Sequence, residues 1–435
     1  MSDTTPCRVA VIGSGIAGAA TAWLLAREPQ RYEVTLFEAD TRPGGHTNSV
    51  DVTLDGHDYP VDTGFLVYNH RTYPNFRALL ELLGVASDAT EMSFSVSLQQ
   101  PDLEWAGSDL TTLLAQPRNL IRPPFWQMLR DIVRFNRAAT AAVQQQHYTH
   151  LTLGEYLQQY RYSRSFSDWY LLPMAGAIWS CPPATMLHYP FSTFARFCHN
   201  HGLLQIINRP PWYTIHGSSR HYLDRLLASV SDLRLGTPIS AVRRQPQGGV
   251  TLHYGEHGDQ SETFDRVVVA CHSDQALALL GDHASERERQ LLAAIGYQPN
   301  RALLHTDRRL LPRRQRVWSA WNYLAGTDAD GERAVSVSYL LNRLQRLPFT
   351  TPLLVSLNPL QEPDPTQIIA QFDYAHPLFD QAAVSAQQQL GEIQGRGGLW
   401  YAGAWQGYGF HEDGLKSALR IATAFGIQVP WQVQL

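Results

Sequence analysis

The stretch RVAVIGSGIAGAATAWLLAREPQRYEVTLFEAD, from Arg8 to Asp40, decides the fold of this chain. Its apolar run at 8–12 is typical of a buried strand, and the Ala- and Leu-rich run at 17–27 predicts a helix. A second apolar run at 33–37 predicts another buried strand beside the first. The segment is therefore predicted to form a βαβ unit, from which doubly wound α/β domains are built.

The turn between the first strand and the helix carries glycines in G-x-G-x-x-G spacing. We assign the tight turn to Gly13, close approach of the backbone to a pyrophosphate to Gly15, and close helix–strand packing to Gly18. The N-terminus of the helix offers unpaired N–H groups and a positive dipole end to phosphates. Glu38 ends the second strand, where its carboxylate can accept hydrogen bonds from ribose hydroxyls. The segment therefore predicts a dinucleotide-binding site.

Size and composition describe a globular protein with more than one hydrophobic core. The chain has 435 residues, of which 44% are hydrophobic and 11% aromatic, and its net charge of -4 gives no reason to expect a nucleic-acid partner. Mean hydropathy is -0.25 and no long apolar run occurs, so we expect no transmembrane segment. The first strand begins so early that no signal peptide is expected before it, which favours a cytoplasmic location.

Cysteine and lysine usage narrows the chemistry. The cysteines, Cys7, Cys181, Cys198 and Cys271, show no paired spacing, so neither a disulfide framework nor a thiolate metal site is expected, and we assign no metal. Of 35 basic residues only Lys416 is a lysine. Any mechanism that requires a lysine must therefore use this one.

A second glycine-rich stretch lies near the other end of the chain, LWYAGAWQGYGFHEDGLKSAL at 399–419. It predicts an apolar strand ending at Gly403, a glycine-rich loop with aromatic residues, and a helix beginning near Gly414. A purely structural strand–loop–helix connection does not usually need so many glycines. We therefore expect this stretch to supply the second half of the cofactor site.

The residues that follow Glu38 carry a family resemblance. Arg42-Pro-Gly-Gly-His46 comes directly after the βαβ unit, and this combination resembles the FAD-binding GG flavoproteins: amine oxidases, phytoene desaturases and protoporphyrinogen oxidases. The resemblance implies that Glu38 holds the adenosine ribose and that Arg42, Gly44 and Gly45 lie along the pyrophosphate and ribityl chain. The sequence departs from many relatives at His46, where they carry arginine. This histidine either contacts the flavin or is an ordinary polar loop residue, and both interpretations stay open.

The resemblance extends to the C-terminal stretch, where it implies that the strand-end glycine meets the pyrophosphate and the helix points its N-terminus at the flavin. It also implies that the backbone at Val242 passes the adenine. The cofactor is thus expected to be FAD. The residues expected to bind it are Gly13, Gly15, Ile16, Ala17, Gly18, Glu38, Ala39, Arg42, Gly44, Gly45, His46, Thr63, Gly64, Phe65, Val242, Gly403, Ala404, Asp413, Gly414 and Leu415.

The middle of the chain follows other patterns. Helical periodicity dominates at 108–208, which indicates an inserted helical region, and regularly spaced strands at 300–379 predict a mixed sheet. We expect an α/β fold with a Rossmann-like FAD-binding domain and an inserted α+β substrate domain. The FAD-binding domain is expected at 1–85, 214–275 and 396–430, and the substrate domain at 86–213 and 276–395.

Two stretches of the middle region allow alternative interpretations. Aromatic residues and prolines crowd 179–213 and are expected either to line a long apolar pocket or to fill the core. Arginines alternate with aromatic residues at 118–137, which fits either a membrane-surface patch or, as we favour, an amphipathic helix packed on its neighbours. A peripheral membrane contact is thus compatible with the sequence.

The expected chemistry follows from the resemblance. Amine oxidases of this superfamily commonly use a lysine on the substrate sheet, whereas this chain has Arg301 and His305 on the corresponding strand. Phytoene-desaturase-like enzymes do not depend on that lysine, so oxidation or desaturation of a C–C bond in an apolar substrate is favoured. Because no second G-x-G-x-x-G occurs, an external acceptor such as oxygen, a quinone or another carrier is expected to reoxidise the flavin. Catalytic residues are not assigned; weak candidates are His411, Tyr408, Trp405 and His305.

Two phrases narrow the resemblance further. SAWNYL at Ser319 and GYGFHEDGLKSAL at Gly407 resemble a bacterial branch of NAD/FAD-binding proteins related to the flavoprotein region of plant cyclopropane-fatty-acid synthases. This implies a fatty-acyl or other lipid substrate. A flavin amine oxidase stays an alternative, as does a non-redox protein of the same fold, since UDP-galactopyranose mutase and the Rab GDP-dissociation inhibitors share it.

Overall fold

The opening segment forms the predicted βαβ unit. In the computed structural model, which describes residues 5–146, 150–205, 209–327 and 333–435, β1 (Cys7–Ile12) pairs in parallel with β2 (Tyr32–Phe37). Between them α1 (Ile16–Ala26) is buried along almost its whole length. Ala-rich composition explains this burial, because small side chains let the helix approach the sheet closely.

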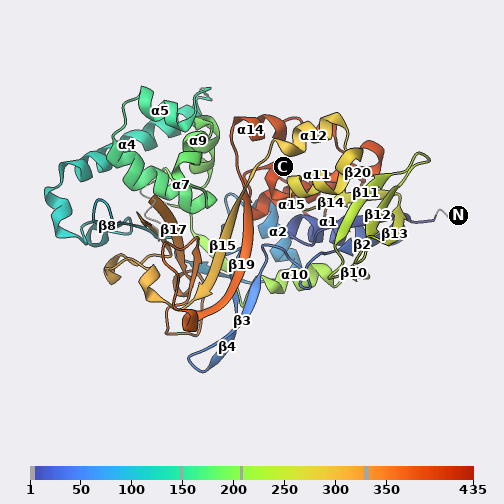
Figure 1. Cartoon of the computed structure of the whole chain (residues 1–435), viewed down its shortest axis with the longest axis horizontal. Coiled ribbons are helices and arrows are strands. Elements are labelled where there is room, and N and C mark those ends of the chain that lie inside the picture. The colour runs from blue at the N-terminus through green and yellow to red at the C-terminus, as the bar shows by residue number, and fades with distance from the viewer. Residues whose placement is uncertain (1–4, 147–149, 206–208, 328–332) are drawn as a thin grey trace.

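A five-stranded parallel sheet grows around this unit, in the order β10-β2-β1-β14-β20. Its further strands come from distant parts of the chain: β10 (Asp232–Arg234), β14 (Arg266–Val269) and β20 (Leu399–Tyr401). One face of the sheet carries α1, α2 (Pro74–Leu83), α10 (Arg220–Leu227) and α15 (His411–Ala424). Figure 1 shows this layer on the right, with blue, green and red segments side by side. Segments from both ends of the chain therefore form this sheet and the helical layer on it.

The other face of the parallel sheet is covered by an antiparallel layer and two helices. These are β11 (Ile239–Arg244), β12 (Val250–Tyr254), β13 (Gln260–Phe264), α11 (Ser273–Leu280) and α12 (Glu286–Ala293). Two boundaries near the C-terminus differ from the prediction, which ended the strand at Gly403 and began the helix near Gly414. Strand β20 ends at Tyr401 and α15 begins at His411. The helix begins earlier because the Asp413 carboxylate caps its first turn by accepting from the backbone N–H of Phe410.

A second, seven-stranded mixed sheet has the order β19-β15-β18-β17-β16-β7-β8. Its strands are β7 (Phe94–Leu98), β8 (Leu103–Ala106), β15 (Tyr297–His305), β16 (Trp321–Thr327), β17 (Arg333–Leu340), β18 (Leu354–Leu357) and β19 (Ile368–Pro377). Five of these strands lie at 297–377, where the sequence predicts a mixed sheet. The seven-stranded sheet also takes in β7 and β8, which the sequence did not predict, and β7 joins β16 in parallel. These strands come from a hairpin too short to stand out by periodicity.

Helices cover the seven-stranded sheet at the upper left of Figure 1. They are α3 (Leu110–Leu113), α4 (Pro123–Gln144), α5 (Leu153–Gln159), α6 (Arg164–Phe166), α7 (Leu172–Trp179), α8 (Pro183–Leu187) and α9 (Phe191–Asn200). These helices lie within 108–208, where the sequence predicts a helical region; residues 147–149 and 206–208 are outside the described ones. Helix α4 buries Phe125, Met128 and Phe135, so it packs amphipathically, as favoured.

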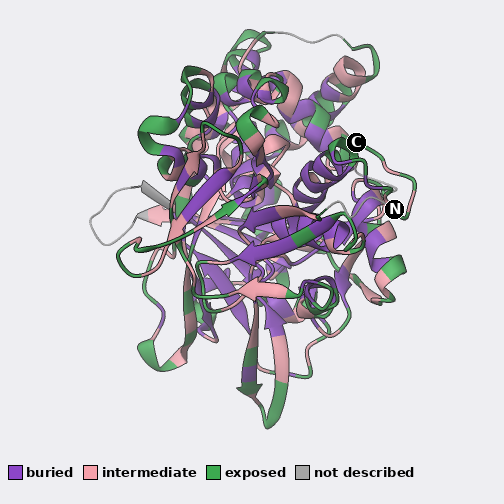
Figure 2. Cartoon of the chain, turned by 90° about the vertical axis from the view of Figure 1, so that its right-hand side faces the viewer, coloured by how far each residue is buried: buried purple, intermediate pink, exposed green. Residues whose placement is uncertain are grey.

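Smaller elements join the two sheets. They are the hairpin of β3 (Ser49–Leu54) and β4 (His57–Asp62), the three-stranded sheet of β5 (Tyr68–Asn69), β6 (Ser87–Thr90) and β9 (Trp212–Ile215), and the helices α13 (Leu341–Leu344) and α14 (Gln381–Gln387). Figure 2 shows that buried residues concentrate where these layers meet. Among the described residues, no helix is long and apolar enough to cross a membrane.

Candidate functional site

A cavity of about 420 Å³, which we call the central cavity, opens where the two sheets meet. Its walls come from the glycine loop before α1, the loop at 44–46, the segment 63–67, the loop after β14, the end of β19, and residues 403–411. The ends of α7 and α9 close its far side. Segments from both ends of the chain and from the inserted region therefore share one site.

The glycines before α1 have different tasks in the structure. A Cβ on Gly18 would lie 1.8 Å from the carbonyl oxygen of Gly13, so only glycine lets α1 lie this close to the turn. Gly13 itself has a φ of 99°, in the left-handed region that favours glycine. By contrast, a Cβ on Gly15 would meet only the carbonyl oxygen of Gly44, at 4.0 Å. Gly18 thus serves packing, whereas Gly15 borders open space in the central cavity.

The Glu38 carboxylate is positioned by the loops around it. One of its oxygens accepts from the backbone N–H of Ser14 at 2.9 Å, and the other accepts from that of Asp40 at 3.0 Å. The Ser14 hydroxyl also donates to this carboxylate and accepts from the backbone N–H of Gly44 at 2.9 Å. Ser14, which sequence reasoning missed, therefore ties Glu38 to both glycine loops.

The C-terminal glycine stretch divides between the cavity and the core behind it. Gly403, Ala404 and the loop up to His411 line the central cavity. Gly414 does not line the central cavity. A Cβ there would lie 2.7 Å from Cγ2 of Ile16, so this glycine lets α15 pack on α1. Asp413 caps α15, and Leu415 is fully buried in the core. A cofactor contact by these three residues stays a prediction.

The other predicted cofactor residues divide in the same way. Those that line the central cavity are Gly13, Gly15, Ile16, Ala17, Glu38, Gly44, Gly45, His46, Thr63, Gly64, Phe65, Gly403 and Ala404. Outside its lining lie Gly18, Ala39, Arg42 and Val242. Arg42 donates to the carbonyl of Gly45 at 3.1 Å and so braces that loop, and the Val242 side chain is buried.

Three of the four catalytic candidates line the central cavity: Trp405, Tyr408 and His411. His305 does not. Its Nε2 lies 2.8 Å from the Ser356 hydroxyl, and its Nδ1 accepts from the backbone N–H of Asp307 at 3.1 Å. Burial lowers the pKa of His305 to about 4, so the ring is neutral and serves the hydrogen bonding of the sheet. The expectation of a catalytic His305 is corrected accordingly.

The His411 ring is contacted at its Nε2 and on its face. Its Nε2 lies 2.6 Å from the Tyr222 hydroxyl and 3.2 Å from that of Thr47, and its ring stacks on Phe65 at 3.8 Å between centroids. Burial lowers its pKa to about 3. The ring is therefore neutral at neutral pH, with its Nε2 engaged by two hydroxyl groups, and a catalytic role of His411 stays a prediction.

A cluster of imidazoles forms another part of the wall. The ring of His46 lies 5.3 Å from that of His376 and 6.4 Å from that of His272, and it stacks on Tyr374. Burial and the neighbouring histidines lower the pKa of His46, and burial lowers that of His376 to about 4. The Nε2 of His46 is buried and has no hydrogen-bond partner among the described residues. His272 and His376 were missed because they meet His46 only in the folded chain.

The far side of the central cavity is aromatic. The crowded stretch at 179–213 serves both interpretations: Trp179, Phe197 and Trp212 line the cavity, whereas Phe191 and Phe194 fill the core of the helical region. Trp321, Tyr339 and Phe410 complete the wall. The indole N–H groups of Trp179 and Trp321 are buried, and within the described part of the chain neither has a hydrogen-bond partner. This wall therefore offers a large apolar surface with a few unused hydrogen-bond donors.

The parallel sheet carries a glycine turn and an acid at the end of its second strand, and an aromatic wall lines the far side of the central cavity. These features define a dinucleotide-dependent enzyme with a separate substrate region. The chain belongs to the family of flavin containing amine oxidoreductases, whose pattern it matches over residues 16–424. It is thus an FAD-dependent oxidoreductase, and the sequence-based expectations of fold class, enzyme class and cofactor are confirmed.

The individual proteins that this chain resembles are distant relatives. A carotenoid phi-ring synthase from Streptomyces griseus is 29% identical over 297 residues, which cover 61% of this chain and 52% of that protein. The chain thus spans about half the length of this relative. Among solved structures, a CLA-producing fatty acid isomerase from P. acnes has a TM-score of 0.67 at 14% identity, covering 98% of this chain and 100% of that one. Cyclohexylamine oxidase from Brevibacterium oxydans IH-35A has a TM-score of 0.62 at 15% identity, covering 97% and 100%.

The residues present fit FAD. Gly15 and Gly45 leave space beside the N-terminus of α1, because a Cβ at either position would meet no atom closer than 3.5 Å. That N-terminus has no side-chain cap, and its N–H groups are available to phosphates. Glu38 supplies the hydrogen-bond acceptor and His46 an unused polar nitrogen. The donor set suits a phosphate-bearing dinucleotide.

Proposed function

We propose that this oxidoreductase oxidises or desaturates a C–C bond of an apolar substrate, fatty-acyl or another lipid. When bound, FAD supplies the two-electron acceptor for such a reaction. The chain's own contribution is to bind the substrate on the aromatic wall, exclude water and orient the reacting bond. The observation that carries this proposal is the composition of the central cavity's walls.

Charge in the central cavity argues against a cationic substrate. Glu38 is the sole carboxylate among the described residues that line it, and it lies beside the glycine turn rather than on the aromatic wall. A buried ammonium group requires a paired charge or strong hydrogen bonds. The aromatic wall offers a cation–π surface at most, so an apolar substrate fits better than an amine.

The position of the single lysine points the same way. Lys416 is on α15 and lies outside the described lining of the central cavity. Arg301, on the strand where the resemblance expected a lysine, is paired with Glu362. An amine-oxidase mechanism that depends on lysine therefore has no residue to use here.

The names of similar proteins support an apolar substrate without establishing it. One relative is called a carotenoid phi-ring synthase and one structural neighbour a fatty acid isomerase, whereas another neighbour oxidises cyclohexylamine. We place this chain with the first two, in a lipid-related branch of the family, because of its cavity walls and its lysine usage. The same proposal assigns FAD contacts to the predicted residues that line the central cavity.

A peripheral membrane contact is part of the proposal. Ile121 is 83% exposed and Trp126 49%, and Leu120 beside them is half exposed. Arg122 and Arg130 lie on the same stretch, so apolar and cationic groups share one edge of the helical region. A lipid substrate and an external quinone acceptor would both be reached from a membrane surface.

The test is anaerobic reduction of the purified holoenzyme. A phospholipid and fatty-acid extract is expected to bleach the flavin absorbance, whereas a panel of polyamines and cyclohexylamine is not. Bleaching by an amine alone would establish the amine-oxidase alternative. A holoenzyme that no lipid and no amine reduces would support the non-redox alternative.

A further inference from the structure

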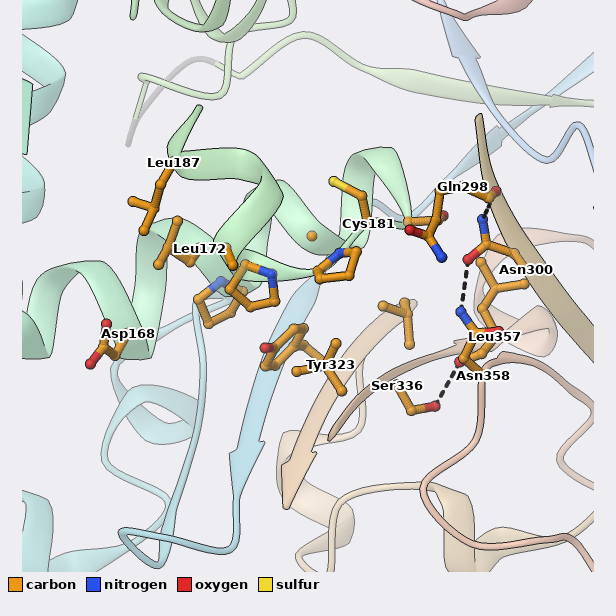
Figure 3. A pocket seen from close by; sticks show the side chains of 18 residues that line it. Asp168, Leu172, Cys181, Leu187, Gln298, Asn300, Tyr323, Ser336, Leu357 and Asn358 are labelled. Atoms are coloured by element: carbon orange, nitrogen blue, oxygen red, sulfur yellow. Dashed lines mark hydrogen bonds between the residues drawn. The ribbon is translucent and has the colours of Figure 1, made fainter. Parts of the chain in front are cut away.

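A second cavity of about 540 Å³, which we call the outer cavity, lies between α7, α8 and the seven-stranded sheet. Leu172, Leu187 and Tyr323 contribute to its mostly apolar walls (Figure 3). Pro182, Ala184 and Asn358 are exposed and mark its mouth. Its size is within the range of about 300–1,000 Å³ that is usual for small-molecule sites.

The outer cavity adjoins the central cavity. Ser180 and Leu357 line both of them. Ser180 ends α7 with a φ of 52°, so the chain turns sharply there: Trp179 faces the central cavity and Cys181 the outer one. The two cavities therefore meet at Ser180 and Leu357.

Amide groups form a polar corner of the outer cavity. Asn358 donates to the Oδ1 of Asn300 at 2.8 Å, and Asn300 donates to the backbone carbonyl of Gln298 at 3.0 Å. Asn300 also lies 3.0 Å from Nδ1 of His376, which lines the central cavity. Of the two N–H bonds on each of the Gln298 and Asn358 amides, a single one is used within the described residues. Both amides can thus donate to a further oxygen at the mouth.

Charge is scarce in the outer cavity. Asp168 is the one charged side chain among the described residues that line it, and Figure 3 shows it on the opposite side from the three amides. A ligand therefore meets apolar walls, a corner of uncharged donors and no cation. These features suit a long hydrocarbon chain whose polar end carries a carbonyl or carboxyl oxygen.

We infer that the outer cavity binds the carboxyl-bearing end of a long-chain acyl substrate and that the chain continues past Ser180 and Leu357 into the central cavity. The polar end meets Gln298 and Asn358, and the remainder extends to the aromatic wall. The reacting bond is consequently in the middle or far part of the chain, away from the carboxyl carbon. This inference rests on the proposed function for the reaction but not for the binding.

The test measures binding of cis-parinaric acid, a fluorescent polyene fatty acid, to the holoenzyme under nitrogen. In the variant Ala184→Trp an indole enters the outer cavity from an exposed position. The Kd of this variant for parinaric acid is expected to rise about tenfold or more. The indole displaces methylene groups of the ligand, and each buried methylene group contributes roughly a factor of four to affinity. The matched control is His188→Trp, on an exposed residue at the end of the same helix that does not line the cavity, and its Kd should stay unchanged.

A second variant tests the polar corner. Gln298→Glu removes an N–H donor and places a carboxylate beside the expected carboxyl group, so binding of parinaric acid should weaken about tenfold and binding of its uncharged methyl ester clearly less. Equal Kd values for Ala184→Trp and His188→Trp would overturn the inference, as would equal weakening of acid and ester. Because no turnover is required, binding that behaves as expected without any flavin bleaching by lipids would sustain this inference and reject the proposed reaction.

Discussion

Two opposite walls of the central cavity are built by different means. The glycine wall, formed by Gly13, Gly15, Gly44, Gly45 and Gly403, presents main chain, and it comes from short motifs near the two ends of the chain. The aromatic wall presents large side chains from the helical region, the seven-stranded sheet and the C-terminal loop; its members are Trp179, Phe197, Trp212, Trp321 and Phe410. Main-chain recognition depends on local spacing, whereas side-chain walls depend on which distant elements meet.

The largest expected effect separates two glycines of the same motif. Gly18→Ala should lower the free energy of unfolding by about 3 kcal/mol or more, because the added Cβ overlaps the Gly13 carbonyl. Gly15→Ala should leave it within about 0.5 kcal/mol, since its Cβ has space. The Gly15 variant should nevertheless be purified with little FAD. Urea unfolding of the apoprotein and the ratio of flavin to protein absorbance measure the two effects.

Equal destabilisation by both substitutions would show that the glycine wall serves packing throughout. Full FAD content in Gly15→Ala would show that the phosphates do not approach the backbone there.

Acid sensitivity should follow the imidazole cluster of His46, His272 and His376. His376 has a pKa of about 4 in the folded chain against about 6.5 when unfolded, so below pH 6.5 the unfolded chain binds more protons. Stability is therefore lost as pH falls from 6.5 towards 4, by about 2.5 kcal/mol at pH 4.5 from this residue alone. His376→Gln keeps an acceptor for Asn300 without titrating.

Urea unfolding of the apoprotein at pH 7 and pH 4.5 provides the measurement. The difference between the two pH values should shrink in His376→Gln, while the other buried histidines keep it above zero. An unchanged difference would mean that His376 is not held neutral by the fold.

A smaller effect is expected on the aromatic wall. Trp179→Phe removes an indole N–H that has no partner within the described structure, so FAD content should not change. Binding of cis-parinaric acid should weaken about fivefold, because a phenyl ring covers less of its hydrocarbon chain than an indole does and the lost apolar contact is about 1 kcal/mol. Trp400→Phe is the matched control, because Trp400 packs on Phe425 away from the cavity. If both variants bind alike, the Trp179 ring does not contact the ligand.

The smallest effect concerns the exposed edge beyond the cavity. Ile121→Asp should reduce binding to vesicles that contain phosphatidylglycerol by about 1–2 kcal/mol, without change in stability or FAD content. Leu82→Asp, which alters another exposed apolar residue on α2, is the control. Co-sedimentation measures both. Vesicle binding that is the same for wild type and Ile121→Asp would show that this edge does not meet a membrane.

Much of the fold could be predicted because its signals are local. The βαβ unit of the opening segment lies where periodicity predicts it. Errors concern elements that need a partner to form. Strands β7 and β8 were missed, since each is short and is stabilised by joining the seven-stranded sheet.

The candidate site shows the same division at the level of single residues. Gly15 and Glu38 could be assigned from spacing alone, and both line the central cavity. His305 was misplaced, because a histidine on a strand gives no sign of the side to which its ring points. His272 and His376 were overlooked for the opposite reason: no motif marks them, and only the meeting of β19 with the loop after β14 brings them to His46.

The sequence by itself determined the class of cofactor and predicts that main-chain groups bind it, because the glycine turn, the helix start and the strand end occur together in one short βαβ segment. It also determined the absence of a lysine on the substrate sheet. Only the tertiary structure decided which aromatic side chains face the cofactor region, and that a second cavity lies behind Ser180 and Leu357. Such walls are assembled from elements hundreds of residues apart, and their geometry exists only once the two sheets have packed together.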